Sequence, residues 1–351
     1  MTMKTRIIHI DEENIDSDLI AQAGRIIKDG GLVAFPTETV YGLGGDALNP
    51  ESSKKIYEAK GRPSDNPLIV HIADMCDMDM IVETVTEDAV KLAENFWPGP
   101  LTMILKKSGK VPFETTGGLD TVAVRMPIHK TAAAFIRASG GYIAAPSANI
   151  SGKPSPTGAK YVIQDMDGRI DMIIDGGDAG IGIESTIVDL SGEIPVLLRP
   201  GYITIEQLRE VIGRVDVDRT ILDGDCKDRP KAPGMKYRHY APSGDLKIVS
   251  GTQKNVIDKI NALTAQAKEQ NRKACVIATK ESERMYSCEN VKSIGSRVDE
   301  ETIAHRLYTI LRECDDEGME IIYSESFDTN GIGQAIMNRL LKAAGHQVIE
   351  T

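Results

Sequence analysis

Short apolar runs alternate with amphipathic stretches along the first 213 residues, and this alternation limits the chain to folds that layer helices on a sheet. The run "IIHI" (7–10) is typical of a strand. Residues 16–31 then predict a helix that begins at Asp and Ser and ends at Gly. Residues 49–61 predict another helix, with Asn as cap, Pro in the first turn and Gly just past the end.

Strands also cluster without helices between them. The runs "MIIDGG", "STIVDL" and "VLLRP" follow one another with short links between residues 172 and 200. A chain that mixes such clusters with βα alternation predicts a mixed α/β (α+β) fold. We therefore expect a twisted mixed sheet with helices around it, rather than a simple doubly wound sheet.

The pattern breaks at about Val215 and resumes after about residue 243. The stretch between is rich in Pro, Gly, Asp and basic residues and has little helical or strand period, which is typical of a linker. The expected organisation is a first domain (1–213), a basic linker (214–243) and a smaller Rossmann-like domain of βαβ units (244–351). In that last domain "NGIGQA" is only a fragment of a dinucleotide-binding motif and lies far from a first βα turn, so no cofactor is expected there.

The linker carries aromatic and apolar side chains that are costly to leave in water. These are Met235, Tyr237, His239 and Tyr240. A solvated tether is the plain interpretation of this segment, yet a tether with such residues is expected to pack against something.

Composition excludes several classes of protein. The formal net charge is −11, which makes the chain a poor general binder of nucleic acid, although residues 214–240 are locally basic. The five cysteines form no CxxC pair and there is no HExxH, so reduced thiols and no protein-caged transition metal are expected. The first residues lack the apolar core of a signal peptide, and no run approaches ~20 apolar residues, so a cytoplasmic protein without a membrane span is expected.

Two cations flank a helix end in "EAKGRPSDNPLIVHI". Lys60 ends the predicted helix, and Arg62 follows Gly61 and precedes a stiffening Pro63. Cations at a helix C-terminus favour the helix dipole, so they are explained without any ligand. An Arg fork beside a Lys point charge also suits a polyphosphate. The stretch alone leaves both interpretations open.

A second stretch, residues 144–158, gathers hydroxyls, amides and glycines directly after a buried-looking strand. It reads "AAPSANISGKPSPTG" and holds Ser147, Asn149, Ser151, Ser155 and Thr157 beside a lysine. Loops of this kind at strand ends offer N–H groups to phosphate oxygens. The chain has no GxxxxGK[ST], which excludes a P-loop. A third stretch, "FPTETVYGLGGDA" (35–47), predicts a small-ligand loop, or else a tight turn.

Polar residues also interrupt four strand patterns: His71, Arg125, Ser185 and Arg199. One such residue is usually a satisfied core group. Four of them, beside three polar strand-end loops, suggest a shared, positively charged cavity.

Together these motifs resemble the YrdC-type threonylcarbamoyl-AMP synthases in their long form, over essentially the whole chain. The matching text is "PTETVYGLGGDA", "KGRPSDNPL", "WPGPLT", "VRMP", "APSANISGKPSPT", "STIVD", "RPG" and "APGMKYRHYAP". The resemblance implies a nucleotidyltransferase that condenses L-threonine, bicarbonate or CO2 and ATP into L-threonylcarbamoyl-AMP and pyrophosphate. Its product feeds the threonylcarbamoyladenosine modification of tRNA, so downstream transfer machinery and a weak tRNA contact are the implied partners.

The resemblance also implies roles for single residues. Lys60 and Arg62 would clamp the ATP phosphates with Asn66 and Ser147 beside them, and Lys60, Arg62, Ser147 and Asn149 would form the catalytic set. Arg125 would pair with the threonine carboxylate, while Thr37, Thr39, His71, Ser147 and Ser185 would hold the rest of that substrate. Thr121, the Ala145 backbone, Asn149, Ser155 and Arg199 would line the nucleotide side, and Tyr237 would fold back over ATP as part of a lid. Mg2+ would enter with ATP, held by its phosphates and not by a protein metal site.

Two other functions remain open at this stage. The same fold resembles proteins described as binders of double-stranded RNA, which the acidic net charge disfavours as a main role. A related module occurs in hydrogenase-maturation proteins that transfer a carbamoyl group from carbamoyl phosphate. Those carry acylphosphatase-like and zinc-finger segments that have no counterpart here.

Overall fold

The computed structural model describes residues 4–219, 221, 231–233 and 240–351. These residues form two compact units, and each is described by itself. Unit 1 comprises residues 1–151, 155–180 and 184–236, and unit 2 comprises 152–154, 181–183 and 237–351. The predicted Tyr237 lid and three of the four aromatic or apolar linker side chains (Met235, Tyr237, His239) lie outside the described residues.

Unit 1 is built on one sheet, in which eleven strands lie within the described residues in the order β1-β8-β2-β3-β7-β4-β6-β5-β9-β10-β11. Parallel and antiparallel pairs alternate irregularly across it, which confirms the predicted mixed sheet. The strands are β1 (Arg6–His9), β2 (Val33–Phe35), β3 (Gly42–Asp46), β4 (Ile69–His71), β5 (Leu101–Lys106), β6 (Thr121–Arg125), β7 (Ile143–Ala145), β8 (Met172–Asp175), β9 (Thr186–Asp189), β10 (Val196–Arg199) and β11 (Asp216–Val217).

Helices join these strands and cover the sheet. They are α1 (Ser17–Lys28), α2 (Pro50–Lys60), α3 (Met78–Ile81), α4 (Glu87–Phe96), α5 (Lys130–Ala138), α6 (Ala159–Met166) and α7 (Ile205–Ile212), with a 3-10 turn η1 (Met75–Asp77). The caps that the sequence predicted for α2 are confirmed. The Asn49 side chain accepts from Glu51 N, and Gly61 ends the helix in the left-handed region at φ 61°.

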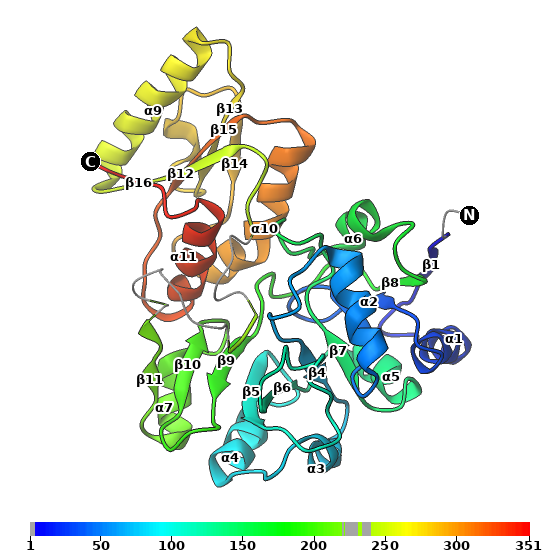
Figure 1. The fold of residues 1–351 in the computed structure, drawn as a ribbon. Coiled ribbons are helices and arrows are strands. Elements are labelled where there is room, and N and C mark those ends of the chain that lie inside the picture. Colours follow the sequence, from blue (N-terminus) through cyan, green and yellow to red (C-terminus); the bar gives the residue numbers. More distant parts are fainter. Residues whose placement is uncertain (1–3, 220, 222–230, 234–239) are drawn as a thin grey trace. The chain divides into compact units, whose positions relative to one another are not determined.

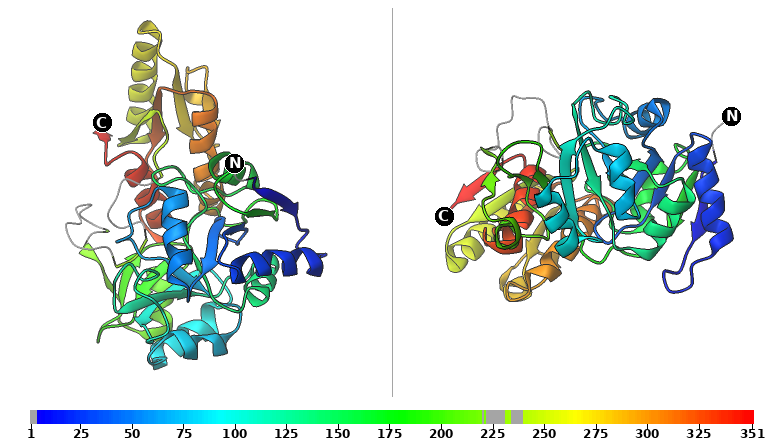
Figure 2. Two further views of the ribbon diagram at one scale, coloured as in Figure 1. Left: turned by 45° about the vertical axis from the view of Figure 1, so that its right-hand side comes forward. Right: turned by 90° about the horizontal axis from the view of Figure 1, so that it is seen from below.

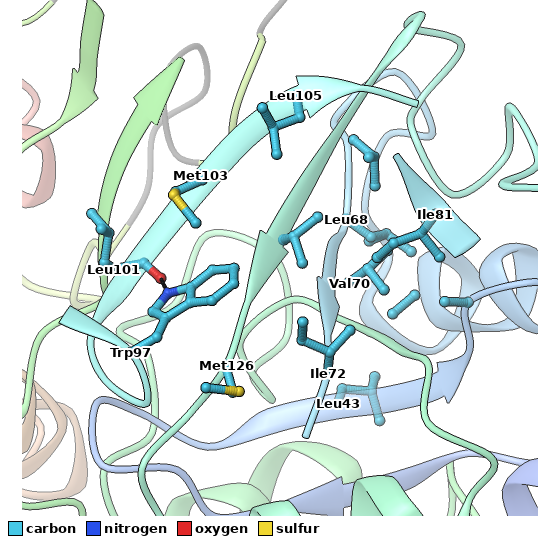
Figure 3. Close-up of a cluster of buried hydrophobic side chains, with 14 of the residues drawn as sticks. Leu43, Leu68, Val70, Ile72, Ile81, Trp97, Leu101, Met103, Leu105 and Met126 are labelled. Atoms are coloured by element: carbon cyan, nitrogen blue, oxygen red, sulfur yellow. Dashed lines mark hydrogen bonds between the residues drawn. The ribbon is translucent and has the colours of Figure 1, made fainter. Parts of the chain in front are cut away.

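The two faces of the sheet bury different cores. One face packs Leu43, Val70 and Met103 with Trp97, whose Nε1 donates a hydrogen bond to Leu101 O at 2.7 Å (Figure 3). The opposite face near β1, β8 and β2 is covered by α1 and α5, which contact each other and can be followed in Figures 1 and 2. The candidate site lies on this second face, farther along the sheet.

Strand β3 corrects the sequence analysis, which predicted a small-ligand loop or a tight turn after a strand that ends at Pro36. Gly42–Asp46 pair with β2 on one side and β7 on the other, in the middle of the sheet. Three of its five residues are glycine, which is unusual for a strand. Neighbouring groups lie too close for a side chain there, since a Cβ on Gly44 would lie 2.8 Å from Ile143 Cγ2. Close packing therefore overrides local propensity.

Helix α6 and strand β11 are among the further elements that were not predicted. Helix α6 follows the residues 144–158 that the sequence analysis treated as a binding loop. Strand β11 lies at the start of the predicted linker and pairs in parallel with β10, so the assignment of that start as irregular was wrong. It is only two residues long, too short to produce a visible period.

Unit 2 holds a parallel sheet of five strands within the described residues, in the order β14-β13-β15-β12-β16. This confirms the Rossmann-like prediction. The strands are β12 (Asp245–Ser250), β13 (Ala274–Ala278), β14 (Val291–Ser293), β15 (Ile321–Glu325) and β16 (Val348–Glu350), and the helices are α9 (Gln253–Glu269), η2 (Glu283–Met285), α10 (Glu300–Asp316) and α11 (Gly331–Ala343). Figure 1 shows α10 and α11 beside each other, and they are in contact.

Unit 2 also includes two short segments from the first half of the chain. The buried Arg312 on α10 donates from Nε and Nη2 to Pro154 O at 3.0 and 2.6 Å. Gly182, at φ +86°, approaches the same helix so closely that a Cβ would lie 2.5 Å from His305 Cα. Residues 152–154 and 181–183 are therefore structural parts of unit 2.

Across the described part of the chain, every helix is too short or too polar to cross a bilayer.

Candidate functional site

Strand register brings four polar residues into one row across the sheet of unit 1. His71 on β4 pairs with Arg125 on β6, and Arg125 pairs with Thr102 on β5. Thr102 pairs with Ile187 on β9, and Ile187 with Arg199 on β10. Residues directly opposite in neighbouring strands point to the same face. The structure therefore collects His71, Arg125, Thr102 and Arg199 on one face, as the shared-site prediction requires for three of them.

An apolar row runs beside this polar row. Ile69, Ala123 and Ile104 pair with one another, and each lies two positions from a member of the polar row on the same face. They form a buried cluster with Ile187, Leu198 and Ala232. The site face therefore carries charged and hydroxyl groups beside this apolar cluster, which we call the apolar floor.

Ser185 and Arg199 form one end of the polar row. Arg199 donates from Nε to Ser185 O at 3.0 Å, from Nη2 to Ser185 Oγ at 3.1 Å and from Nη1 to Pro233 O at 3.2 Å. Ser185 Oγ also bonds Thr102 Oγ1 at 2.7 Å. All three side chains are buried, so the guanidinium keeps the serine fixed.

Arg125 lies at the centre of the row and is bound to the loop after β2. Its Nη1 donates to Thr39 Oγ1 at 2.8 Å and its Nη2 to Glu38 Oε1 at 2.7 Å. Thr39 in turn bonds Thr37 Oγ1 at 2.9 Å. The predicted threonine-side residues Thr37, Thr39 and Arg125 are thus one hydrogen-bonded group, and Glu38 is an addition that the sequence analysis missed.

His71 is buried beside Arg125. Burial and the neighbouring guanidinium lower the pKa of His71 to about 3, against hydrogen bonds from its ring to the Ile69 and Ile143 backbones that oppose the shift. The imidazole is therefore neutral near pH 7. Its ring also meets the Phe35 ring edge-on at 5.9 Å.

Lys60 lies beneath the loop that follows β7. The Nζ atom donates to Ser147 O at 2.5 Å and also to Asn149 O, and the side chain is only 1 % exposed. Above it, Ser147 Oγ donates to Asn149 Oδ1 at 2.5 Å, and Asn149 Nδ2 donates to Ile150 O at 2.8 Å. The four predicted catalytic residues include these three, and the structure brings the three together.

Arg62 and Asn66 lie on the turn after α2. Arg62 Nη2 donates to Asn66 O at 3.4 Å and to Pro67 O at 3.2 Å. Asn66 is buried, and its Oδ1 has no hydrogen-bond partner within the described residues. An unsatisfied buried amide oxygen is costly and requires a group that donates hydrogen, whereas the Nδ2 atom of the same side chain is the one that suits a phosphate oxygen.

The remaining predicted residues take different positions. Ala145 ends β7 opposite Ile69, at the border of the apolar floor. Ser155 Oγ donates to Glu184 Oε1 at 2.6 Å, and both are buried. Thr121 begins β6, four residues from Arg125 on the same face, so ~13 Å of strand separates them. Thr121 is therefore not part of the Arg125 group but lies at the far side of the floor.

Three polar residues at the site were missed: Glu38, Thr102 and Glu184. Thr102 looks like part of an apolar strand, and only its spacing of two from Ile104 assigns it to the site face. Glu38 and Glu184 lie beside predicted residues, so their neighbours in the sequence were the available signal.

Comparison with known proteins gives the family. A family model described as "Telomere recombination" matches residues 25–201, and one described as "Threonylcarbamoyl-AMP synthase, C-terminal domain" matches residues 203–345. The threonylcarbamoyl-AMP synthase of Bacillus subtilis is 50 % identical over 340 residues, which are 97 % of this chain and 96 % of that protein. That of Pyrococcus abyssi is 48 % identical over 346 residues, 99 % of each.

A solved structure agrees over the whole length. The structure of P. abyssi Sua5 complexed with L-threonine matches with a TM-score of 0.94 at 48 % identity and covers 99 % of this chain and 100 % of that one. The fold and these matches define a two-part protein of the Sua5 type. The chain belongs to the threonylcarbamoyl-AMP synthase family, which confirms the resemblance seen in the motifs.

Proposed function

We propose that the chain condenses L-threonine, bicarbonate or CO2 and ATP into L-threonylcarbamoyl-AMP with release of pyrophosphate, the first step of tRNA threonylcarbamoyladenosine synthesis. The observation that carries this proposal is the polar row His71–Arg125–Thr102–Arg199 beside an apolar floor on one sheet face. The row offers guanidinium and hydroxyl groups for an amino acid and phosphates, and the floor offers surface for a base. The solved threonine complex of the P. abyssi relative supports the choice of amino acid.

The amino acid would bind at the Arg125 end of the row. Arg125 pairs with its carboxylate, because a guanidinium fork matches a carboxylate in shape and charge. Thr37, Thr39, His71, Ser147 and Ser185 surround the amine, the side-chain hydroxyl and the carbamate. Neutral His71 offers no charge of its own there, so Arg125 remains the main cation at this end.

ATP would bind across the floor and the loop after β7. Arg62, Asn66, Ser147 and Asn149 contact the phosphates, and Lys60 holds the loop that presents them. The Ala145 backbone, Thr121, Ser155 and Arg199 line the nucleotide side, and Thr121 lies ~13 Å along β6 from Arg125, which takes the amino acid. Tyr237 is assigned to ATP by resemblance alone.

Mg2+ would arrive with ATP. Within the described residues no three His, Cys, Asp or Glu side chains cluster as a metal site. Phosphate oxygens and water are the ligands that Mg2+ prefers in such reactions, and the ion would neutralise phosphate charge.

The chemistry requires positioning more than a protein nucleophile. The threonine amine captures CO2 to give a carbamate, whose oxygen attacks the α-phosphate in line while pyrophosphate leaves. Both nucleophiles come from the substrates, so the protein contributes orientation and positive charge at the phosphates. The product is a mixed anhydride that a tRNA-modifying transferase would consume in the cytoplasm. A net charge of −11 leaves at most a weak direct contact with tRNA.

Mass spectrometry tests the proposal directly. Purified protein is incubated with ATP, L-threonine and 13C-bicarbonate, and the product and pyrophosphate are measured. We expect an AMP conjugate that carries one labelled carbon, with pyrophosphate release that requires all three substrates. Release that is indifferent to threonine or bicarbonate would contradict the proposal, and omission of each substrate in turn is the control.

A further inference from the structure

Glu38 is a buried carboxylate with one oxygen unsatisfied. Glu38 stands between Thr37 and Thr39 in the sequence and is 9 % exposed. Oε1 accepts the 2.7 Å hydrogen bond from Arg125 Nη2, whereas Oε2 has no partner within the described residues. A buried acceptor without a donor is costly, so Oε2 points to a ligand group that donates hydrogen.

The hydroxyl protons beside Glu38 are already used within the protein. Thr37 donates its single hydroxyl proton to Val40 O at 2.7 Å, so the 2.9 Å bond between Thr37 and Thr39 is donated by Thr39. Thr39 Oγ1 meanwhile accepts from Arg125 Nη1. With both protons used, only lone pairs remain here, on Thr39 Oγ1 and Glu38 Oε2.

Charge around Arg125 is nearly balanced. Glu38 opposes the guanidinium at 2.7 Å in an environment where both side chains are buried, so the pair is weakly screened. Of the neighbouring histidines, burial lowers the pKa of His71 to about 3 and also lowers that of His129, so neither adds much positive charge near pH 7. Such a site receives a zwitterion without a change in net charge, whereas a monoanion makes it negative.

We propose that Glu38 is a specificity-determining residue that, by balancing Arg125 and offering an acceptor, makes the site select an amino-acid zwitterion over the corresponding hydroxy-acid anion. The inference rests on the proposed function, in which Arg125 takes the carboxylate and the free amine later captures CO2. Selection of a substrate that carries this amine is what the carbamate step requires.

The test compares two ligands that differ only in the amine. Calorimetry measures the dissociation constants of L-threonine and of 2,3-dihydroxybutyrate, in which a hydroxyl replaces the α-amine, with the wild type and with Glu38→Gln. We expect the ratio of the two constants, hydroxy acid over threonine, to fall at least tenfold in Glu38→Gln, because threonine binds more weakly while the anion binds as well or better. Glu38→Asp, which keeps the charge, should leave the ratio near the wild-type value.

Glu12→Gln is the matched control, since Glu12 is a second carboxylate near His129, with Oε1 3.5 Å from His129 Nδ1. It should leave both constants unchanged. A merely structural role for Glu38 predicts that both ligands weaken together, and an unchanged ratio in Glu38→Gln overturns the inference. Should Glu38→Gln not fold, wild-type binding decides: L-threonine must bind at least tenfold more tightly than dihydroxybutyrate, and equal or reversed affinities overturn the inference.

The two proposals fail separately. If the wild type makes no labelled AMP conjugate, the proposed function fails whatever Glu38 does. If it makes the conjugate while the ratio stays constant, only the role of Glu38 is wrong.

Discussion

Lys60 and Arg125 show that the buried cations at this site are already bound by the protein. Lys60 donates to the carbonyls of Ser147 and Asn149, and Arg125 donates to Glu38 and Thr39. Long cationic side chains sample many rotamers in water, and these hydrogen-bond partners hold each of them in one geometry. Pre-oriented charge costs little reorganisation when a phosphate or carboxylate arrives.

Replacement of Lys60 by Met should lower stability without any ligand present. The substitution leaves the Ser147 and Asn149 carbonyls without their donor, and each buried acceptor that loses its hydrogen bond costs about 1–3 kcal/mol. Urea unfolding in the absence of ATP measures the loss, and pyrophosphate release should fall with it. If Lys60 served only as a phosphate clamp, unfolding without ATP would be unaffected.

His71 should make the fold sensitive to acid. Its pKa is about 3 in the folded state against ~6.5 in the unfolded chain, so between these values the unfolded state binds the extra proton. Stability is therefore full above pH ~6.5 and falls as the pH drops toward 3, by up to ~1.4 kcal/mol per pH unit. His71→Gln removes this contribution, and unfolding measured from pH 6 to 4 should show a shallower slope. Parallel curves for the two proteins would contradict the pKa.

At the scale of elements, the turn after β10, which holds Gly201, packs closely against the start of β9. A Cβ on Gly201 would lie 2.4 Å from Thr186 N and 2.8 Å from Ser185 C. Ser185 is the residue that Thr102 and Arg199 hold in place. The turn therefore helps to fix the position of Ser185, although no residue of the turn is proposed to bind a substrate.

Gly201→Ala should displace Ser185 and weaken threonine binding, with a loss of about 1–3 kcal/mol in stability from overpacking. Calorimetric titration with threonine and thermal unfolding measure the two effects. Gly192→Ala is the control, because among the described residues a Cβ there would have only Ile194 O within 4.0 Å. Equal behaviour of the two variants would mean that the turn has no part in the site.

Local rules predicted most of these elements, and long-range pairing explains the exceptions. Helix α2 was predictable because Asn49, Pro50 and Gly61 act within one turn of their own positions. Strand β3 was not, because its glycines are required by neighbours such as Ile143, a hundred residues away. Likewise His71, Arg125 and Arg199 were recognisable as odd polar residues in strands. Their alignment with Thr102 depends on the strand order β4-β6-β5-β9-β10, which is not the order of the chain.

At the scale of the molecule, the division into units does not follow the chain. Residues 152–154 and 181–183 belong to unit 2, while Asn149, Ser155 and Ser185 belong to unit 1. The sequence analysis placed its boundaries near residues 213 and 243, at the two ends of the linker, since linkers are visible in composition and isolated tripeptides are not. Residues proposed for ATP and threonine thus follow or precede, within three positions, segments that unit 2 holds.

Arg312→Ala should accordingly raise the KM for ATP more than that for threonine. It leaves Pro154 O without its two donated hydrogen bonds, one residue before Ser155. Arg306→Ala on the same helix is the control, because Arg306 is exposed and its ion pair with Glu313 is long, at 3.8 Å. Pyrophosphate-release kinetics with each substrate varied give the comparison. Identical kinetic constants for the two variants would show that Pro154 needs no support from Arg312.

The hydrogen bonds from Arg312 to Pro154 join residues 158 positions apart. During translation the loop beside Ser155 leaves the ribosome long before Arg312 has been added to the nascent chain. At about 5–20 residues per second, the wait is about 8–30 s. A newly made first half therefore cannot complete this loop by itself, and activity should arise only after synthesis has passed α10.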